Sequence, residues 1–247
     1  MRSEILPAVR STRTLGNHTV TTPVQTSVQS SVLVVSTDPQ GSTVWWADRV
    51  GDSLPFDFLQ THDDPAGLKA LRDLGAKVHV VCNQKGGVGK TTLTVNCAAV
   101  VHDTIGTGST GYRHIFIDTP GSLEDENLLA ASLDIADDVI VPMPPEPLAF
   151  DPTARTIERV IKPRGLPYRV VVNNWDPRDG KADLEDTRAY ITAMGWERTN
   201  AVVRRYKLHT RASAEGKVVT QYQRNRIAME AREDFFRLAL ELGYGAH

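Results

Sequence analysis

The sequence predicts an α/β fold in which helices cover both faces of a doubly wound, mostly parallel sheet. Short β-branched runs that are apolar on both faces are typical of buried parallel strands. These runs alternate with segments of helical periodicity, which favours successive strand–helix units in one sheet. The predicted strands are 32–36, 78–82, 114–118, 138–142 and 169–173, with a shorter one at 201–203.

The predicted helices fill the intervals between these strands. They lie near 42–50, 65–74, 90–103, 124–133, 150–161, 181–194 and 226–242. Residues 1–30 are rich in Ser and Thr and have little apolar periodicity, so we predict a flexible tail there. The remaining 31–247 then form one domain.

Composition narrows the class of protein. The 247 residues carry a net charge of −2, which by itself indicates no particular class of binding partner. Cys82 and Cys97 sit in apolar segments without metal-ligand spacing, so we expect reduced core thiols. No stretch approaches the roughly 20 apolar residues of a transmembrane helix, and the N-terminus lacks the apolar core of a secretion signal. We therefore expect a cytoplasmic protein.

A glycine-rich loop joins the strand at 78–82 to the helix at 90–103. Glycines let backbone N–H groups curl around phosphate oxygens, and the helix N-terminus adds unpaired donors. Lys90 is placed to reach the β- and γ-phosphates, and the Thr91 hydroxyl to bind Mg²⁺. The alternative is a turn without a ligand. The predicted nucleotide-binding residues of the loop are Lys85, Gly86, Gly87, Val88, Gly89, Lys90, Thr91 and Thr92.

Two further boxes carry carboxylates. Asp118 ends a buried strand and is followed by Thr-Pro-Gly. A buried acid needs a counterion, and a hydrated Mg²⁺ beside Thr91 is a natural one, so Asp118 is a predicted metal ligand through water. Asp38 begins an Asp-Pro-Gln-Gly sequence that by itself also fits a turn. Capping the next turn is the alternative role for Asp118.

The loop from Lys85 to Thr92, with Gln84 where the general pattern has glycine, resembles the deviant Walker A box of the ParA/MinD ATPase family. The resemblance covers roughly 31–243, and small ParA-type partition proteins match best. It implies a P-loop ATPase that uses ATP and Mg²⁺ with three catalytic residues. Lys90 binds its own nucleotide, Lys85 reaches the phosphates of a second subunit, and Asp38 orients the attacking water.

The resemblance also has gaps. Ser36 replaces an aspartate of the family's Asp-x-Asp-Pro-Gln-Gly box. Asn173 falls where family members often contact adenine, although Asn174 is an alternative and capping of the following Asp176-Pro177 turn is as good an explanation.

A basic segment near the C-terminus suggests a nucleic-acid partner. Its predicted DNA-binding residues are Arg204, Arg205, Lys207, Arg211, Lys217 and Arg224, against a single acid, Glu215. A solvated basic face is the alternative. The final helix is acidic on its polar face, which argues against a membrane-binding helix.

The family resemblance implies a DNA-partition ATPase for plasmid partition or chromosome segregation. Such a protein forms a homodimer with ATP, coats non-specific DNA at the nucleoid and is stimulated by a ParB-like centromere-binding protein. One alternative is a ParA-like ATPase for another cargo, such as secretion, pilus or polysaccharide machinery. Another is a nucleotide-binding scaffold or regulator without efficient hydrolysis.

Segment order departs from the family, in which the phosphate-loop strand comes first. Here Asp38 precedes Lys90, as if the blocks 32–75 and 77–105 had exchanged places. A strand–helix unit begins and ends at the same edge of a parallel sheet, so such an exchange moves only connections at the edge opposite the ligand. We therefore predict that strand 32–36 joins the sheet in parallel and that Asp38, Lys90 and Asp118 converge.

Overall fold

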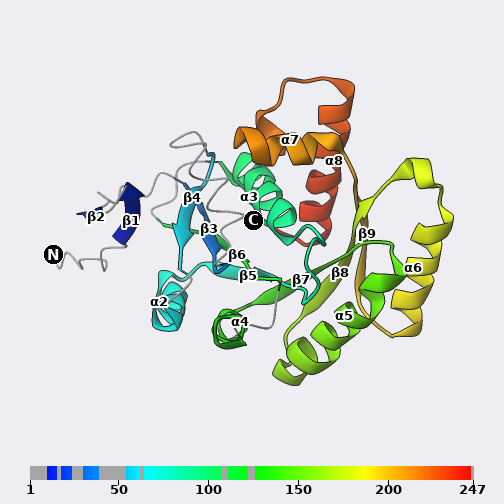
Figure 1. The fold of residues 1–247 in the computed structure, drawn as a ribbon, viewed down its shortest axis with the longest axis horizontal. Coiled ribbons are helices and arrows are strands. Elements are labelled where there is room, and N and C mark those ends of the chain that lie inside the picture. The colour runs from blue at the N-terminus through cyan, green and yellow to red at the C-terminus, as the bar shows by residue number, and fades with distance from the viewer. Residues whose placement is uncertain are drawn as a thin grey trace.

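A seven-stranded parallel sheet forms the framework of the computed structural model (Figure 1), in the order β4-β3-β6-β5-β7-β8-β9. The structure describes residues 10–15, 18–23, 30–38, 54–61, 64–106, 111–121 and 126–245. The strands are β3 (Val32–Ser36), β4 (Asp57–Gln60), β5 (Lys77–Val81), β6 (His114–Asp118), β7 (Asp138–Met143), β8 (Tyr168–Trp175) and β9 (Arg198–Arg204). All neighbouring pairs run parallel, which confirms the predicted fold class.

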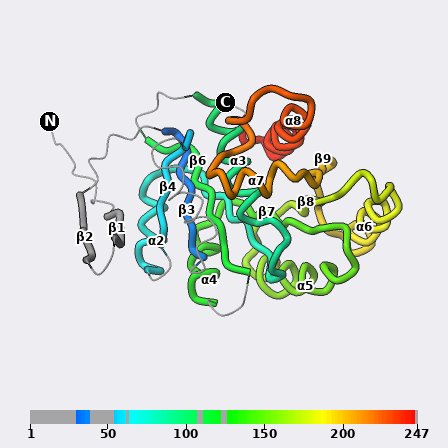
Figure 2. Tube along the Cα trace, turned by 45° about the horizontal axis from the view of Figure 1, so that its top comes forward, coloured from blue at the N-terminus to red at the C-terminus, as the bar shows by residue number. Residues whose placement is uncertain are grey.

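Helices cover both faces of this sheet (Figures 1 and 2). Buried side chains of α2, α4, α5 and α6 share one core cluster, whereas those of α3, α7 and α8 share the other. The helices are α2 (Pro65–Ala70), α3 (Lys90–Ile105), α4 (Glu126–Asp134), α5 (Phe150–Arg155), α6 (Ala182–Ala193), α7 (Lys207–Glu215) and α8 (Arg226–Glu241). The 3-10 turn η2 (Leu71–Leu74) extends α2, and the π-helix η5 (Thr156–Ile161) extends α5.

Most predicted elements are present, but beyond residue 30 the strand β4 and the helix α7 were missed. The edge strand β4 is short and only partly buried along its length, so it lacks an apolar run. Helix α7 buries only Ala212 and therefore has no apolar stripe to reveal it. The helix predicted at 42–50 lies outside the described residues. Cys82 and Cys97 are both buried free thiols, as expected.

The N-terminal segment contains two strands that the sequence did not indicate. Strands β1 (Arg10–Leu15) and β2 (His18–Pro23) pair antiparallel in a separate two-stranded sheet. The division of the chain near residue 30 stays a prediction.

The register of three central strands positions the site. Strand β6 lies between β3 and β5, and Asp118 pairs in register with Ser36 on one side and Val81 on the other. The segments that follow these strands therefore leave the sheet at the same edge, where open α/β sheets bind ligands. Strand 32–36 joins the sheet in parallel, as predicted, and its exchange of order relative to the family stays a prediction.

A buried polar cluster lies at the opposite edge of the sheet, where β5, β6 and β7 begin. His79 Nδ1 lies 2.8 Å from Asp138 Oδ2, and His79 Nε2 lies 2.9 Å from His114 Nδ1. The Tyr244 hydroxyl donates to Asp138 Oδ1 at 2.7 Å, which ties the C-terminal end of the chain to the sheet. Burial, with His79 and the cations Arg113 and Lys77, lowers the pKa of His114 to about 4.

This cluster predicts a loss of stability in mild acid. Because the pKa of His114 is lower in the folded state than the ordinary 6.5, the unfolded chain binds the extra proton between pH 6.5 and about 4. His114→Gln should therefore flatten the fall of unfolding free energy over this range, by up to about 1.4 kcal/mol per pH unit. Urea titrations at several pH values measure this slope. His102→Gln is the control, and an unchanged slope in His114→Gln would contradict the prediction.

Candidate functional site

The phosphate loop connects β5 to α3 in a conformation that requires glycine. Gly87 and Gly89 have φ values of +74° and +84°, in the left-handed region that favours glycine. At Gly89 a Cβ atom would also lie 2.5 Å from Asn173 Nδ2, which is well inside van der Waals contact. Gly89 is therefore fixed both by its backbone and by its neighbour.

Asn173, at the end of β8, holds this loop in place. Its buried side-chain amide donates to the carbonyl oxygen of Val88 at 2.6 Å. The sequence predicted an adenine contact for Asn173, which stays a prediction, and did not reveal this support of the loop. Asn174, the alternative, has a φ of +64°, the one positive value among the described residues other than glycine.

Asn83 supports the start of the loop and was also missed. Its Nδ2 donates at 2.9 Å both to the carbonyl oxygen of Pro142 in β7 and to Thr153 Oγ1 of α5. Its Oδ1 accepts from the Lys85 backbone N–H at 2.9 Å. The one sequence signal for this role is a polar residue directly after a buried strand.

Lys90 lies at the centre of the site, largely buried, at the first position of α3. Its Nζ donates to the carbonyl oxygens of Asn83 at 3.1 Å and Lys85 at 3.3 Å, within the loop itself. Burial lowers the pKa of Lys90, and the charges of Asp118 and Asp38 oppose that change. Asp118 and Asp38 both lie within electrostatic range of Lys90, and the meeting of all three side chains in one site stays a prediction.

The predicted metal ligands are in direct contact. Thr91 Oγ1 donates to Asp118 Oδ2 at 2.7 Å, and Asp118 is fully buried. Thr37 fixes the end of β6, because its backbone N–H and its hydroxyl both donate to the Asp118 carbonyl at 3.0 Å. A hydroxyl beside a carboxylate is a pair of hard oxygen donors of the kind that Mg²⁺ prefers. The residues present therefore fit a Mg²⁺ site at this position.

Two further residues lie close to these groups. A Cβ atom at Gly121, which follows Asp118 in the Thr-Pro-Gly sequence, would lie 3.2 Å from both Gly86 Cα and Lys90 Nζ, so this turn packs tightly on the loop. Ser36, which replaces an aspartate of the family box, is buried, and its Oγ has no hydrogen-bond partner among the described residues.

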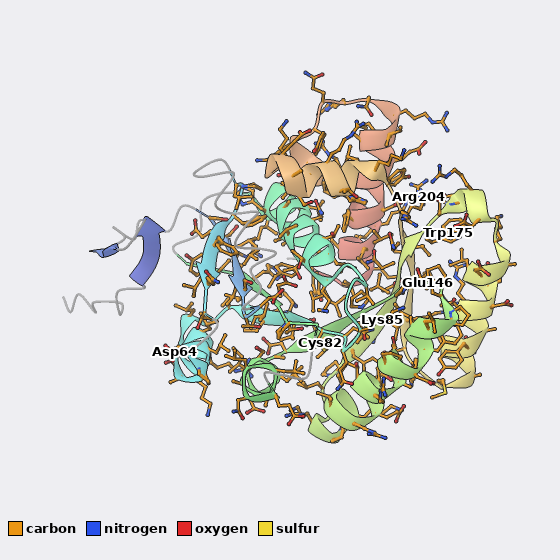
Figure 3. All side chains as sticks on the ribbon, in the orientation of Figure 1. Asp64, Cys82, Lys85, Glu146, Trp175 and Arg204 are labelled. Carbon is orange, nitrogen blue, oxygen red and sulfur yellow. The ribbon has the colours of Figure 1, made fainter. Side chains whose placement is uncertain are left out.

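Lys85 lies at the rim of the loop, in an ion pair within its own chain. Its Nζ is 3.3 Å from Glu146 Oε2, on the segment that follows β7 (Figure 3). The two side chains are 23% and 55% exposed, so the pair faces solvent. The side chain of Lys85 therefore lies at the surface of the loop, whereas that of Lys90 is largely buried.

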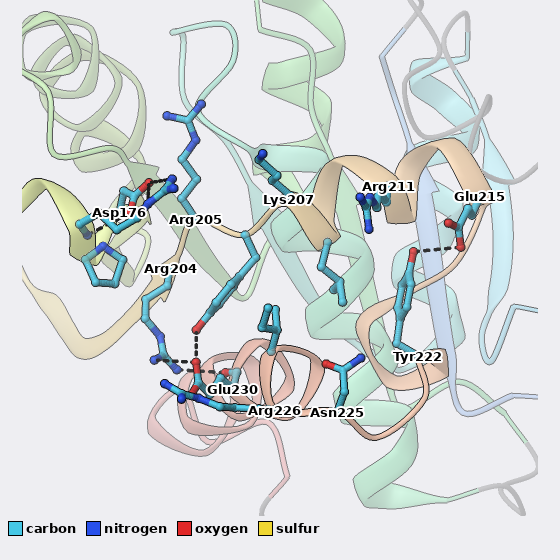
Figure 4. Close-up of a pocket in the computed structure, with 15 residues that line it drawn as sticks. Asp176, Arg204, Arg205, Lys207, Arg211, Glu215, Tyr222, Asn225, Arg226 and Glu230 are labelled. Carbon is cyan, nitrogen blue, oxygen red and sulfur yellow. Dashed lines mark hydrogen bonds and ion pairs between the residues drawn. The ribbon is translucent and has the colours of Figure 1, made fainter.

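The predicted DNA-binding cations differ in their contacts, and Figure 4 shows Arg204, Arg205, Lys207 and Arg211 among them. Arg204 has a structural role, because its guanidinium joins β9 to α8. It donates to Asp234 Oδ1 at 2.7 Å and to the Glu230 carbonyl at 3.1 Å. Lys217 pairs with Glu215 at 3.0 Å. Four cations are exposed and form no ion pair within the described part of the chain. These are Arg205, Lys207, Arg211 and Arg224.

Three of these exposed cations stand beside a groove. The groove has a volume of about 710 Å³ and lies between α7 and the beginning of α8. Arg205, Lys207 and Arg211 line it together with the apolar side chains Leu208 and Ile227. None of the predicted nucleotide-binding residues lines this groove, so it is separate from the phosphate loop.

A glycine loop that opens a helix at the carboxyl edge of a parallel sheet, with a buried lysine and a Thr–Asp pair, defines a P-loop nucleotide-binding protein. Comparison with known proteins narrows the class. The chain is 32% identical over 216 residues to the "Maintenance of carboxysome distribution protein A" of Gloeobacter kilaueensis. The match covers 87% of this chain and 82% of that protein. No family model matches the chain.

Solved structures agree on the fold. Apo McdA from Cyanothece superposes with a TM-score of 0.51 at 14% identity, covering 87% of this chain and 88% of that one. An ATP complex of a McdA variant from Cyanothece gives the same TM-score over 87% and 85% of the two chains. The chain belongs to the ParA/MinD family of deviant Walker A ATPases. It is accordingly an ATPase that uses ATP and Mg²⁺.

The packing of Gly89 yields a test of the loop. Gly89→Ala should lower nucleotide affinity at least about tenfold, because the new methyl group displaces Asn173 and with it the Val88 carbonyl. Gly106→Ala is the matched control, since Gly106 also has a positive φ, of +72°, but open space around it. That control should cost about 1–2 kcal/mol of stability and leave nucleotide affinity unchanged. Titration with a fluorescent ATP analogue measures the nucleotide affinity of both variants. Equal affinities of Gly89→Ala and the wild-type protein would contradict the role of Asn173.

Proposed function

We propose that this chain positions a cargo by cycling between ATP-bound dimers on non-specific DNA and released monomers, with hydrolysis stimulated by a partner protein on the cargo. The observation that supports the proposal is the contact between Thr91 and Asp118 beside the buried Lys90, with Asp38 as a second carboxylate within electrostatic range of that lysine. The named relative, a carboxysome distribution protein, supports the positioning role.

The chain's own side chains suit hydrolysis. When bound, ATP supplies the phosphoryl group and Mg²⁺ offsets its developing charge. Lys90 and the backbone N–H groups of the loop bind the phosphates, and Thr91 with Asp118 holds the metal. Asp38 is the carboxylate that orients the attacking water by accepting a hydrogen bond from it. Lys85 of a second subunit adds a cation at the phosphates, as the family resemblance implies.

We propose that the dimer binds to DNA. Arg205, Lys207 and Arg211 follow β9 and lie along α7, exposed and free of ion pairs within the described residues. Cations of this kind contact backbone phosphates without reading sequence. None of the described helices is long and apolar enough to span a membrane. We therefore propose a location at the nucleoid.

The cargo has two candidates. The family resemblance favours plasmid or chromosome partition with a ParB-like partner, whereas the relative's name favours a protein-shelled compartment. The gene downstream separates them: a centromere-binding protein supports partition, and a compartment-associated adaptor supports the second. Secretion, pilus or polysaccharide machinery beside the gene would replace both. A scaffold without turnover is excluded by measurable ATP hydrolysis in the presence of DNA and the downstream protein.

The role of Asp38 can be isolated. Asp38→Ala should leave ATP binding intact and reduce turnover by about 10²-fold or more, because it removes the carboxylate that orients water and leaves the phosphate loop unaltered. Phosphate release with DNA and partner protein measures turnover. Asp73→Ala, at an exposed position on η2, is the control. Wild-type turnover in Asp38→Ala would assign the catalytic carboxylate elsewhere.

DNA binding should follow charge on α7. Arg205→Ala combined with Lys207→Ala should weaken binding equally for unrelated DNA sequences and lower the log–log salt slope by about one per lost phosphate contact. Lys69→Ala, exposed on α2 at the other face of the sheet, is the matched control. Fluorescence anisotropy at several salt concentrations provides the slope. An unchanged slope in the double variant would move the DNA surface away from α7.

A further inference from the structure

The groove between α7 and the beginning of α8 is large enough to hold a ligand. Its volume of about 710 Å³ lies within the range of sites that enclose drug-sized molecules. Figure 4 shows Arg205, Lys207 and Arg211 along one side of it and Asn225 and Arg226 along the other. A DNA duplex is wide enough to hold an α-helix in its own major groove, so it does not enter a space between two adjacent helices. A short peptide segment does.

Two hydrogen bonds hold the sides of this groove in place. Tyr206, directly before α7, donates its hydroxyl to Glu230 Oε2 of α8 at 3.3 Å. Tyr222, in the connection between α7 and α8, donates to Glu215 Oε2 at the end of α7, also at 3.3 Å. Figure 4 shows the two bonds well apart along the groove. The shape of the groove is therefore largely set before a ligand binds, which lowers the conformational entropy lost on binding.

The lining of the groove carries positive charge that the fold does not use. Each of the three acids that line it forms an ion pair with a cation of the same chain. These pairs are Asp176–Arg178, Glu215–Lys217 and Glu230–Arg226. The three groove cations, Arg205, Lys207 and Arg211, are exposed and form no ion pair within the described residues. The groove therefore complements an anionic ligand.

Apolar side chains lie among these charges. Ile227, at the beginning of α8, is 53% exposed and lines the groove together with Leu208 of α7, which is half-buried. Contacts to DNA phosphates come from cationic and polar groups, so these two side chains add nothing to them. They suit an apolar side chain, whose burial is favourable. A peptide with carboxylates around an apolar residue uses both properties of the groove.

We propose that this groove binds an acidic segment of the partner protein, with an apolar side chain of that segment against Ile227 and Leu208 and its carboxylates beside the three groove cations. The segment then competes with DNA, because the same cations contact DNA phosphates. This competition rests on the DNA binding proposed above, whereas binding of the peptide to the groove does not. Partner binding thereby weakens the hold of the protein on DNA at the cargo.

The test uses three fluorescein-labelled peptides of equal length and the full chain with ATP. In the first peptide leucine recurs at every third or fourth position and glutamate fills the others. In the second, serine replaces each leucine, and in the third, lysine replaces each glutamate. Fluorescence anisotropy should show that the first binds at least about tenfold more tightly than the other two. An unlabelled DNA duplex should displace it.

Two substitutions separate the groove from the DNA surface. Ile227→Ser should weaken binding of the first peptide at least about fivefold and leave DNA affinity unchanged, because it removes an apolar contact and no charge. Arg211→Gln should weaken the binding of both ligands. Met229→Ser is the matched control, since Met229 is an apolar residue of α8 that is 47% exposed and does not line the groove. It should change neither affinity, and the thermal midpoint should stay the same in all three variants.

The outcomes distinguish this inference from the proposed function. Equal binding of the first two peptides, or unchanged peptide affinity in Ile227→Ser, would overturn the groove as a peptide site. If Ile227→Ser weakened DNA binding as much as peptide binding, the groove would belong to the DNA surface. A peptide that DNA does not displace from a DNA-binding chain overturns the competition alone. A chain that binds the first peptide but no DNA leaves the groove standing and removes the DNA surface.

Discussion

Two buried asparagine side chains hold the phosphate loop to the sheet, and the rest of the site depends on them. Asn83 fixes the beginning of the loop to β7 and α5, and Asn173 fixes the Val88 carbonyl from β8. Gly87 and Gly89 have positive φ values and make this loop intrinsically flexible. Without the two asparagine contacts, the loop would be ordered only by its ligand, and the lost conformational entropy would weaken binding. Because these side chains hold the loop beforehand, the N–H groups that face the phosphates are preorganised.

The same arrangement explains why a buried lysine is tolerated. Lys90 would be costly in a dry pocket without partners. Two backbone carbonyls of the loop accept its hydrogen bonds, and Asp38 and Asp118 supply negative charge from the ends of β3 and β6. The register between Ser36 and Asp118 is what brings these two strands level. The site is thus shared by three strands that are distant in the chain but adjacent in the sheet.

The basic residues near the C-terminus fall into two groups. Some are paired with acids inside the fold, and others are exposed and could bind a partner. Arg204 joins β9 to α8 through Asp234, so its charge is largely neutralised within the fold. Arg205, the next residue, is exposed, and its backbone N–H donates to the Trp175 carbonyl at 2.7 Å. The segment between β9 and α7 is in this way hydrogen-bonded to β8, the strand that supports the phosphate loop through Asn173. A physical connection therefore exists between the nucleotide site and the proposed DNA surface.

The sequence by itself determined the fold class, the phosphate loop and the acids that serve it. Apolar runs on buried strands, and glycines with lysine and threonine at fixed spacing, are local patterns that require no knowledge of distant residues. It did not reveal β4 or α7, because a short edge strand and a helix with one buried alanine carry no periodic apolar signal.

Only the tertiary structure decided which side chains support the loop and which cations are available. Asn83 and Asn173 act through contacts with residues 59 to 85 positions away, and Arg204 looks like its neighbours until Asp234 is placed beside it. A sequence pattern gives the type of a residue and its spacing from its neighbours in the chain. The burial and the hydrogen-bond partners of that residue depend on which distant segments the sheet places next to it.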